Sequence, residues 1–550
     1  MGADNFESSK KDEIEIIETM EKFGKYQKVQ YFYACISAIF ITMIHINYVF
    51  VAGDLNYRCR IPECENQYAV YNVTWWPSST IDRCTRPKLK ENFGVGQKCT
   101  NESFTHAVEE CADWVFETNN TVIATLNLAC QPWKSNLIGT IHNVGMLLAG
   151  ITSGWLTDRF GRKPTLIICS VGSCIGHLKT FTSSYYLYVF IEMLEAAVAG
   201  GSYTAAMVLM IEIGGKKNRI LSGVLFAYAV YMGESLFACI AMFVPDWKNL
   251  IRIIYSPPIV FITYIFLLKE SPRWQILNGR AEDAKSTLLH IAQLNNININ
   301  KQNLANMNAE GLKKELKIEN YELEEGYSNV LKSKEILKRV LIGAFCRFTA
   351  SFVYYGLMVN SVYLPGNQYT NFMLSTVMSY PGELISMYLM NRIGRKLPMM
   401  YGYFTCGVLC VASGWIPEEY TWLKISSFLF GKLLVSICYT GVITYTMELF
   451  PTSVRGTLLG VCALASSTGN MFAPLTPILN TVSVILPSMF FGGFAIISGA
   501  LLTQTPETKD LPLIDTIEQV ERSAKLKERR RRGISTKGED NYGFDNNIIA

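Results

Sequence analysis

A short basic turn between two long apolar stretches occurs twice in this chain. The first copy is GWLTDRFGRKP at 154–164, and the second is LMNRIGRKLP at 389–398. Because the copies lie about half a chain apart, we expect two similar halves joined in the middle, as in polytopic folds with internal repeats. A soluble chain has little reason to repeat a charged loop between apolar runs long enough to cross a bilayer.

Apolar runs of the length that a bilayer requires follow one another along the chain, six before and six after a polar stretch. Only 17% of the residues are charged, 49% are apolar and the mean hydropathy is positive. We therefore predict an all-α membrane protein with 12 transmembrane helices in two six-helix halves, an architecture of secondary transporters. The runs lie at roughly 29–50, 136–157, 164–182, 185–211, 221–244, 250–268, 340–364, 369–390, 397–416, 421–447, 456–480 and 483–503.

Basic residues are unevenly distributed over the short loops between these runs. The loops after the second, fourth, eighth and tenth runs carry Lys or Arg, whereas the short loops on the other side have almost none. Because Lys and Arg mark the cytoplasmic side, we expect both termini and the linker inside. The expected domains are the N-terminus 1–28, a bundle 29–268 that includes an external loop 51–134, a helical linker 269–339, a bundle 340–503 and a tail 504–550.

The net charge of +4 is, in this interpretation, a topology signal and not a nucleic-acid footprint. Membrane lipids are the expected surroundings, and the basic tail run at 525–532 can bind anionic lipid headgroups or act as a solvated topological anchor. The sequence leaves the oligomeric state open.

The first loop has an independent external signature. It holds six of the chain's fifteen cysteines, an even number that predicts disulfides, although six cysteines allow 15 pairings and the sequence does not choose among them. Three Asn-X-Ser/Thr sites, at Asn72, Asn101 and Asn119, predict glycosylation. A metal site is not expected, because the cysteines lack close paired spacing with histidine. The cysteines are Cys59, Cys64, Cys84, Cys99, Cys111 and Cys130.

Several motifs resemble those of one transporter family. The repeated turn is similar to the loop signature of the major facilitator superfamily. ESPRW at 270–274, ELFPTSVR at 448–455, PETKDLP at 506–512 and YYGLMVN at 354–360 resemble motifs of the organic cation/anion/zwitterion transporters, solute carrier family 22. The six-cysteine loop separates this family from sugar porters, and the pair Glu192 and Glu195 looks most like its invertebrate organic-cation-type branch. The resemblance implies the major facilitator fold and a plasma-membrane carrier that works by alternating access.

Acidic residues lie at the cytoplasmic ends of the runs that adjoin the basic turns. Such carboxylates can pair with arginines of neighbouring loops when the cytoplasmic side is closed and must separate when it opens, so they bias a two-state equilibrium. The alternative is that the basic residues only set topology, but topology requires no acidic partner. The predicted gating residues are Asp158, Arg159, Arg162, Glu212, Arg392, Arg395, Glu448 and Arg455.

Ionisable residues within the runs indicate the charge of the substrate, because such residues are costly in a membrane and usually face a cavity or a partner. Four acids, Glu192, Glu195, Glu234 and Glu383, stand against two bases, Arg347 and Lys432, which favours a cation or zwitterion. Glu234 lies near the centre of its run beside tyrosines, and a carboxylate with aromatic faces can hold an amine. The alternative is a structural ion pair of Glu234 with Arg347 or Lys432. The predicted substrate-binding residues are Glu234, Glu383, Tyr228, Tyr231, Tyr354, Glu195, Ser467 and Lys432.

Departures from the family limit what the resemblance implies about substrate charge. Positions that carry charge in cation or anion carriers fall here on Ser467 and Ser379. The arginine that several facilitator families associate with proton coupling is Glu192 here, which favours facilitation driven by the membrane potential over proton antiport.

An enzyme is not expected, because the five histidines are scattered, no phosphate-binding loop lysine pattern occurs and no cofactor is implied. The leading hypothesis is a non-ATP carrier of small organic cations or zwitterions. The alternatives are a sugar or organic-anion porter, or a non-transporting receptor derived from a transporter.

Overall fold

The computed structural model of the chain describes residues 22–65, 69–76, 83–90, 98–215, 218–297, 301–308, 310–312, 330, 332–451, 453–509 and 517–522. Within these residues nine helices are long and apolar enough to cross a membrane. The basic tail run expected at 525–532, and most of both termini, lie outside this part of the chain. The nine helices are Lys25–Val51, Pro132–Phe160, Tyr185–Gly214, Arg219–Phe243, Trp247–Leu267, Lys334–Tyr363, Lys396–Trp415, Thr421–Leu449 and Arg455–Thr481.

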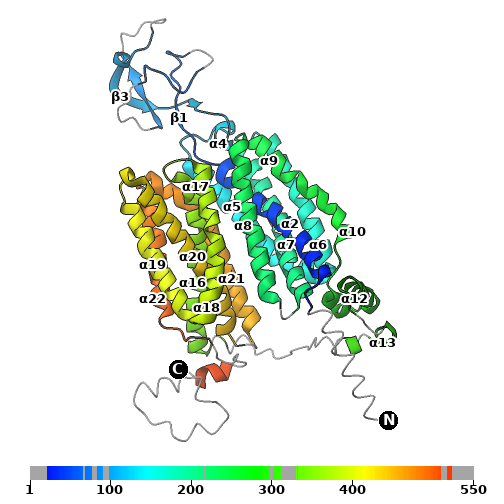
Figure 1. Ribbon diagram of the computed structural model, residues 1–550. Helices are drawn as coiled ribbons and strands as arrows, with labels where there is room; N and C mark the ends of the chain where they lie inside the picture. Colours follow the sequence, from blue (N-terminus) through cyan, green and yellow to red (C-terminus); the bar gives the residue numbers. More distant parts are fainter. Residues whose placement is uncertain are drawn as a thin grey trace, which may run out of the picture.

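The helices form two bundles that stand side by side (Figure 1). In the first bundle the expected run at 164–182 is a short α-helix continued by a 3-10 helix, and the run at 250–268 consists of three consecutive pieces. The elements of this bundle are α2 (Lys25–His45), α3 (Tyr48–Val51), α5 (Pro132–Phe160), α6 (Arg162–Gly172), η2 (Ser173–Phe181), α7 (Tyr185–Gly214), α8 (Arg219–Phe243), α9 (Trp247–Tyr255), η3 (Pro257–Thr263) and α10 (Tyr264–Leu267).

The second bundle is interrupted in similar ways. Pro381 lies in the first turn after the break between α17 and α18, and Pro474 and Pro477 lie in the 3-10 segment that follows α21. Proline interrupts a regular helix because it has no backbone N–H to donate. The elements are α16 (Lys334–Asn360), η4 (Ser361–Tyr363), α17 (Gln368–Val377), α18 (Ser379–Arg392), α19 (Lys396–Trp415), η5 (Glu418–Tyr420), α20 (Thr421–Leu449), α21 (Arg455–Phe472), η6 (Ala473–Thr481) and α22 (Leu486–Leu502).

The loop between α3 and α5 forms a small β domain at one end of the bundles (Figure 1). Strand β1 (Tyr57–Cys59) pairs with β4 (Trp114–Phe116), and β2 (Thr85–Leu89) pairs with β3 (Phe104–Glu110), both antiparallel. The six cysteines form three disulfides, which confirms that part of the prediction: Cys59–Cys111, Cys64–Cys99 and Cys84–Cys130. The short helices η1 (Asn101–Ser103) and α4 (Val122–Thr125) complete the loop.

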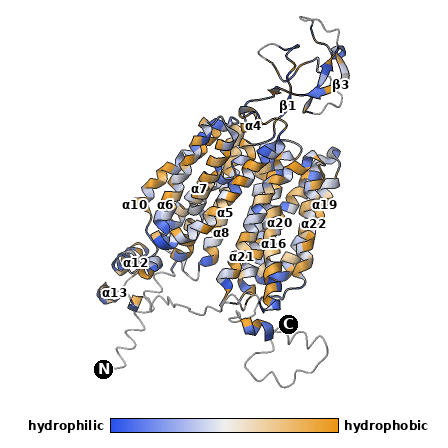
Figure 2. Ribbon diagram, turned by 180° about the vertical axis from the view of Figure 1, so that it is seen from behind, coloured by the Kyte–Doolittle hydropathy of each residue, from blue (hydrophilic) through white to orange (hydrophobic). Residues whose placement is uncertain are grey.

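The opposite end of the bundles carries the linker. Helix α12 (Ala281–Asn295) follows α11 (Pro272–Leu277) and precedes α13 (Lys301–Asn306). Figure 2 shows hydrophobic residues along the helices of both bundles, whereas the linker helices and the β domain mix hydrophilic and hydrophobic residues. We call the two ends of the bundles the loop end and the linker end.

The two bundles join near the loop end. One apolar cluster there contains Phe50 of the first half and Phe372 of the second, whose rings lie 5.2 Å apart, and Thr140 donates to the carbonyl of Met471 at 3.1 Å. At the linker end, by contrast, each buried apolar cluster combines one half with linker or tail residues and contains nothing from the other half, around Leu209 or around Tyr445. The halves are therefore packed together at the loop end and each packs on itself at the linker end.

Candidate functional site

The repeated basic turn makes the same contacts in both halves. Its glycines, Gly161 and Gly394, have φ of 108° and 132°, a backbone region that favours glycine. The arginine that follows each pairs with a glutamate of the same half: Arg162 Nη2 lies 2.9 Å from Glu212, and Arg395 Nε lies 3.1 Å from Glu448. The repeat in the sequence thus becomes a repeated ion pair at the linker end.

A second carboxylate in each half caps the helix that begins at the basic turn. Glu270 accepts from the backbone N–H of Lys163 at 3.0 Å, at the start of α6. Glu507 accepts from the backbone N–H groups of Arg395 at 2.8 Å and Lys396 at 3.0 Å, at the start of α19. A carboxylate is stabilised there by the unpaired N–H groups and the helix dipole. These caps come from the ESPRW and PETKDLP motifs, so motifs distant in the sequence meet the repeated turn.

The two capping carboxylates differ in protonation behaviour. Burial raises the pKa of Glu270, and its backbone hydrogen bonds offset this only in part. Burial also pushes the pKa of Glu507 upward, but four backbone N–H bonds outweigh it and hold this pKa below the ordinary value.

The remaining predicted gating residues lie around these pairs. Asp158 is exposed and 3.2 Å from Arg162, while Arg159 and Arg392 are exposed. Arg455 donates to the carbonyl of Phe450 at 3.1 Å. The sequence predicts that the pairs form when the two halves meet at this end, but the Arg162 and Arg395 pairs form within single halves while the halves are joined at the loop end. Their geometry therefore stabilises each half internally.

Between the halves, a group of tyrosines surrounds Glu234 of α8; we call it the central cluster. Glu234 is 1% exposed, and its Oε2 atom is buried without a hydrogen-bond partner. Among the described residues it makes neither a hydrogen bond nor an ion pair. Seven tyrosines from six helices lie close enough to feel its charge: Tyr48, Tyr203, Tyr231, Tyr354, Tyr355, Tyr380 and Tyr439. An unpaired buried carboxylate is costly and calls for an explanation.

Lys432 of α20 belongs to the central cluster but is not in direct contact with Glu234. It is fully buried, its Nζ donates to the carbonyl of Tyr354 at 2.9 Å, and it lies 3.1 Å from the centroid of the Tyr354 ring. Glu234 and Lys432 interact electrostatically, but their charged atoms are more than 4.0 Å apart, so they form no ion pair. Lys432 therefore has partners of its own, and its attraction to Glu234 acts over a longer distance than an ion pair.

The second predicted acid, Glu383 of α18, is held by hydroxyl groups. Tyr231 of the first half donates to it at 3.3 Å, and Thr440 of the second half donates to it as well. This contact links the two halves at mid-height. Tyr228 lies beside it, with its ring centroid 5.3 Å from that of Tyr380.

Arg347 of α16 is the other base of the second half. Its Nε is buried without a hydrogen-bond partner, and its charge acts on Tyr439, which also feels Glu234. Ser467 is half-buried on α21, next to Ser466, whose hydroxyl bonds to Ser351 of α16. Arg347 is thus a second buried positive group near the tyrosines that feel Glu234.

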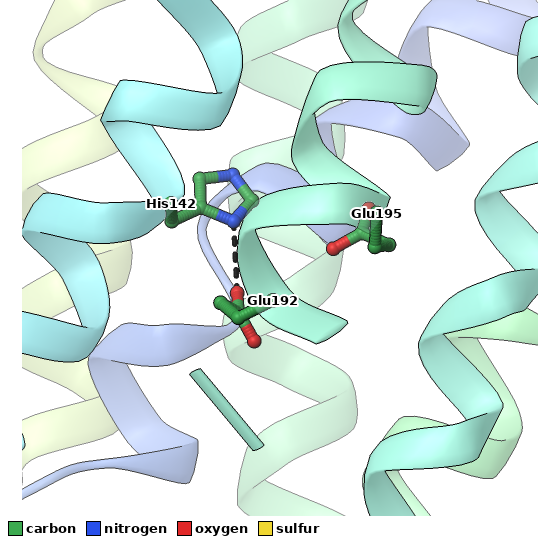
Figure 3. A group of neighbouring side chains, drawn as sticks. All are labelled: His142, Glu192 and Glu195. Atoms are coloured by element: carbon green, nitrogen blue, oxygen red, sulfur yellow. Dashed lines mark hydrogen bonds and ion pairs between the residues drawn. The ribbon is translucent and has the colours of Figure 1, made fainter. Parts of the chain in front are cut away.

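Glu192 and Glu195 lie elsewhere, inside the first half (Figure 3). Both are 0% exposed. His142 Nδ1 lies 2.8 Å from Glu192, and Lys179 Nζ lies 2.8 Å from Glu192 and 3.5 Å from Glu195. Tyr255 donates to Glu195 at 3.0 Å. We call these residues, with His45, the buried network.

The buried network changes the charge count that the sequence supplies. Two of the four acids counted there face a base, Lys179, that the count left out, and the central cluster keeps two acids and two bases. Lys179 and His142 were accessible to sequence reasoning, because each is an ionisable residue inside an apolar run. The hydrogen bond between His142 and Glu192 spans 50 residues, and no spacing rule predicts it.

By distance, His142, Glu192 and Glu195 can all face one metal ion, since their ligand atoms lie within 4.8 Å of one another. The ammonium of Lys179 already supplies a positive charge to both carboxylates. The donor set therefore fits a salt-bridged network better than a metal ion.

Comparison with solved structures defines the class of this fold. The inward-open conformation of the xylose transporter XylE from E. coli has a TM-score of 0.55 and 18% identity over 74% of this chain and 92% of that chain. Its partially occluded inward-open conformation has a TM-score of 0.58 and 13% identity over 89% of this chain and 100% of that chain. The chain thus has the helical fold of major facilitator carriers.

Sequence comparison identifies the family. The profile described as Sugar (and other) transporter matches residues 95–519, so the chain belongs to that family of secondary transporters and is a multi-pass membrane protein. The curated relatives place it within the organic cation transporters of solute carrier family 22. An organic cation transporter-like protein of Drosophila melanogaster is 28% identical over 92% of this chain and 91% of its own length. Solute carrier family 22 member 3 of Rattus norvegicus is 26% identical over 91% and 94%. Members of this family are carriers, so the chain is not an enzyme.

Proposed function

We propose that this protein carries small organic cations or zwitterions across the plasma membrane by alternating access, as an uptake carrier. The observation that carries the proposal is Glu234, a buried carboxylate without a partner at the junction of the two halves, among tyrosine rings. A carboxylate with aromatic faces attracts a protonated or quaternary amine by charge and by cation–π interaction, about 2 kcal/mol or more for a desolvated ring. The names of the Drosophila and rat relatives agree with this substrate class.

Arg347 extends the proposal to zwitterions. Its unpartnered Nε and Glu234 both act on Tyr439, so a ligand with an amine and a carboxylate could pair with both groups. Glu383, Tyr228, Tyr231, Tyr354, Lys432 and Ser467 remain the other proposed contacts, whereas we assign Glu195 to the buried network. A sugar is uncharged, so it would leave the buried charged groups of the site uncompensated. An organic anion would be repelled by the carboxylate of Glu234. A transporter-derived receptor is the remaining alternative.

We further propose twelve membrane spans with both termini and the linker in the cytoplasm and the β domain outside. The nine long apolar helices support this when α6 with η2, α17 with α18, and α22 are added as shorter or bent spans. The domain limits are those expected from the sequence: 29–268 and 340–503 for the bundles, with the loop 51–134, the linker 269–339, and the N-terminus 1–28 and the tail 504–550 at the cytoplasmic face. In this orientation the loop end is extracellular, and the structure is an inward-facing state of the carrier.

Glycosylation tests this orientation. Asn72, Asn101 and Asn119 are all exposed on the β domain or its junction, so we expect enzymatic removal of N-glycans to increase the electrophoretic mobility of protein made in eukaryotic cells. The triple variant Asn72→Gln/Asn101→Gln/Asn119→Gln should migrate like the deglycosylated protein. An unchanged mobility, together with no labelling of the loop by a membrane-impermeant reagent on intact cells, would show that the loop is not outside.

Uptake by cells that express the chain tests the proposed function. We expect labelled tetraethylammonium or carnitine to accumulate above the level in control cells, and inward-negative potential to increase cation uptake because each cation moves with the field, about 2.3 kcal/mol per 100 mV. A labelled organic anion and a labelled sugar serve as matched comparisons. Uptake of the anion or the sugar alone would replace this proposal with the corresponding alternative, and binding without uptake would favour the receptor.

A further inference from the structure

We propose that the buried network is a proton-binding site, and that a proton bound there opposes the binding of an organic cation at the central cluster. The proton site stands on the geometry of the first half alone. Its coupling to an organic cation rests on the proposed function.

The charge balance of the network calls for a proton. Glu192 and Glu195 are fully buried, and the single ammonium of Lys179, also fully buried, faces both. With neutral imidazoles and both carboxylates ionised, the network carries one excess negative charge in an apolar bundle, and an uncompensated buried charge is strongly unfavourable. One added proton brings the sum to zero. The other titratable groups that face the network are Tyr48, Tyr188, Tyr203, Tyr255 and, from the far side of Tyr255, His177.

Two unpartnered atoms point to the same imbalance. Glu195 Oε1 is buried without a hydrogen-bond partner, while its other oxygen accepts from Tyr255. His45 Nε2 is also buried without a partner. The network therefore has unused capacity both to hold negative charge and to accept a proton.

A chain of hydrogen bonds leads from His45 into the network. His45 Nδ1 lies 3.2 Å from His142 Nε2, and His142 Nδ1 lies 2.8 Å from Glu192. Because an ionised carboxylate only accepts, His142 carries its proton on Nδ1, and its Nε2 accepts from the Nδ1–H of His45. That assignment leaves a free lone pair on His45 Nε2. The His45 ring lies 5.5 Å from the ring of Tyr203, which in turn feels the charge of Glu234, so His45 is on the central-cluster side.

Proton uptake along this chain balances without any other reactant. A proton binds the lone pair of His45 Nε2, and the proton on His45 Nδ1 passes to His142 Nε2. His45 ends neutral with its proton on Nε2, and His142 ends as an imidazolium held against the Glu192 carboxylate. The network changes from one excess negative charge to none, and no electrons are transferred.

Proton and cation then influence each other through the field. The unprotonated network adds a negative charge behind Tyr48 and Tyr203, both of which also feel Glu234, and this favours a cation at the central cluster. A bound proton removes that charge, and by linkage a bound cation lowers proton affinity by the same factor. In the sequence Glu192 argues against proton antiport because it replaces an arginine, but its hydrogen bond to His142 gives this position a proton-binding partner of its own.

Infrared difference spectra of purified, substrate-free protein test the proton site directly. Between an alkaline and an acid pH, we expect imidazole-to-imidazolium bands in the wild type that are lost in His142→Gln. His290→Gln, which changes a histidine of linker helix α12, is the matched control and should retain them. Wild-type and His142→Gln spectra with the same histidine bands would overturn the proposal, whatever the protein transports.

Binding of tetraethylammonium at the same two pH values tests the coupling. We expect the wild type to bind about fivefold or more weakly at the acid pH, a typical coupling factor. Glu192→Gln should bind tetraethylammonium at both pH values with the weaker affinity that the wild type shows at acid pH, because the excess negative charge is gone. His142→Gln should bind it at both pH values with the tighter affinity that the wild type shows at alkaline pH, because the proton site is gone. Both variants keeping the wild-type pH dependence would overturn the coupling.

If the variants fail to fold, a measurement on the wild type alone still tests the coupling. Saturating tetraethylammonium, added to lightly buffered protein near pH 6.5 with a pH-sensitive dye, should release protons, since both the network and Glu234 itself lose proton affinity beside a bound cation. Cation binding without proton release contradicts the coupling. No binding of tetraethylammonium or carnitine at all contradicts the proposed function instead, and the infrared spectra then decide the proton site by themselves.

Discussion

Replacing Glu234 with glutamine is expected to reduce cation affinity at least tenfold, about 1.4 kcal/mol, while a neutral analogue of similar size keeps its affinity. The amide retains the size of the side chain but not the charge that offsets the lost hydration of a buried amine. Lys432 keeps its bonds to Tyr354 in the variant, so it is not left without a partner. Uptake of labelled cation and neutral analogue, normalised to surface protein, measures the difference.

The ion-pair alternative makes a different forecast for the same position. If Glu234 serves mainly to neutralise Lys432, then Glu234→Gln lowers surface expression for every substrate, and the double variant Glu234→Gln/Lys432→Gln restores it. Glu282→Gln, an exposed glutamate of the linker, is the control for loss of a carboxylate as such. Unchanged cation affinity in well-expressed Glu234→Gln would remove this residue from the substrate site.

Arg162→Ala and Arg395→Ala are each expected to lower the maximal uptake rate by about tenfold or more and to change substrate affinity by no more than about twofold. Each arginine pairs with a glutamate of its own half, and its guanidinium also donates to a carbonyl at the end of the preceding helix, that of Thr157 or Met390. Removal of the buried Arg162 or the partly buried Arg395 leaves Glu212 or Glu448 uncompensated, a penalty of roughly 1–3 kcal/mol. The lost pair destabilises the linker end, which must rearrange during turnover, and leaves the central cluster unchanged.

Concentration-dependent uptake and equilibrium binding on the same preparations separate rate from affinity. Arg522→Ala is the matched control, because its pair with Glu518 is exposed and lies outside both bundles, where such pairs contribute little. Equal loss of binding and rate in correctly folded Arg162→Ala would assign this residue to the substrate site or to the stability of the half. A normal rate would leave topology as the role of the basic turn.

The conformational interpretation of these pairs depends on where the halves meet. Residues of both halves share the apolar cluster at the loop end, and the clusters at the linker end are separate. The arginine–glutamate pairs are therefore formed while the linker end of one half is apart from the other. In this state the arginine–glutamate pairs stabilise each half internally. Further contacts between the halves would form when the two linker ends meet.

The contribution of the sequence is clearest where the physics is local. Hydropathy locates the spans because a backbone in lipid must satisfy its own hydrogen bonds, so each span is a helix of predictable length. The Gly-Arg-Lys repeat reveals two similar halves because each copy needs a glycine at positive φ followed by a cation, and both occur at Gly161 and Gly394. The six clustered cysteines indicate disulfides, but their pairing required the fold of the β domain.

The tertiary structure alone decided which ionisable residues belong together. Glu192, Glu195 and Glu234 look alike in the sequence, since each is an acid within an apolar run. Packing of α5 and η2 against α7 brings His142 and Lys179 onto the first two, whereas Glu234 faces the second half without a partner. Electrostatic interactions at 3 Å and at 10 Å differ severalfold, and sequence spacing carries no information on distances between helices. The sequence by itself thus determined the class of protein and its charged inventory, and the packing of the helices determined which charges remain available to a ligand.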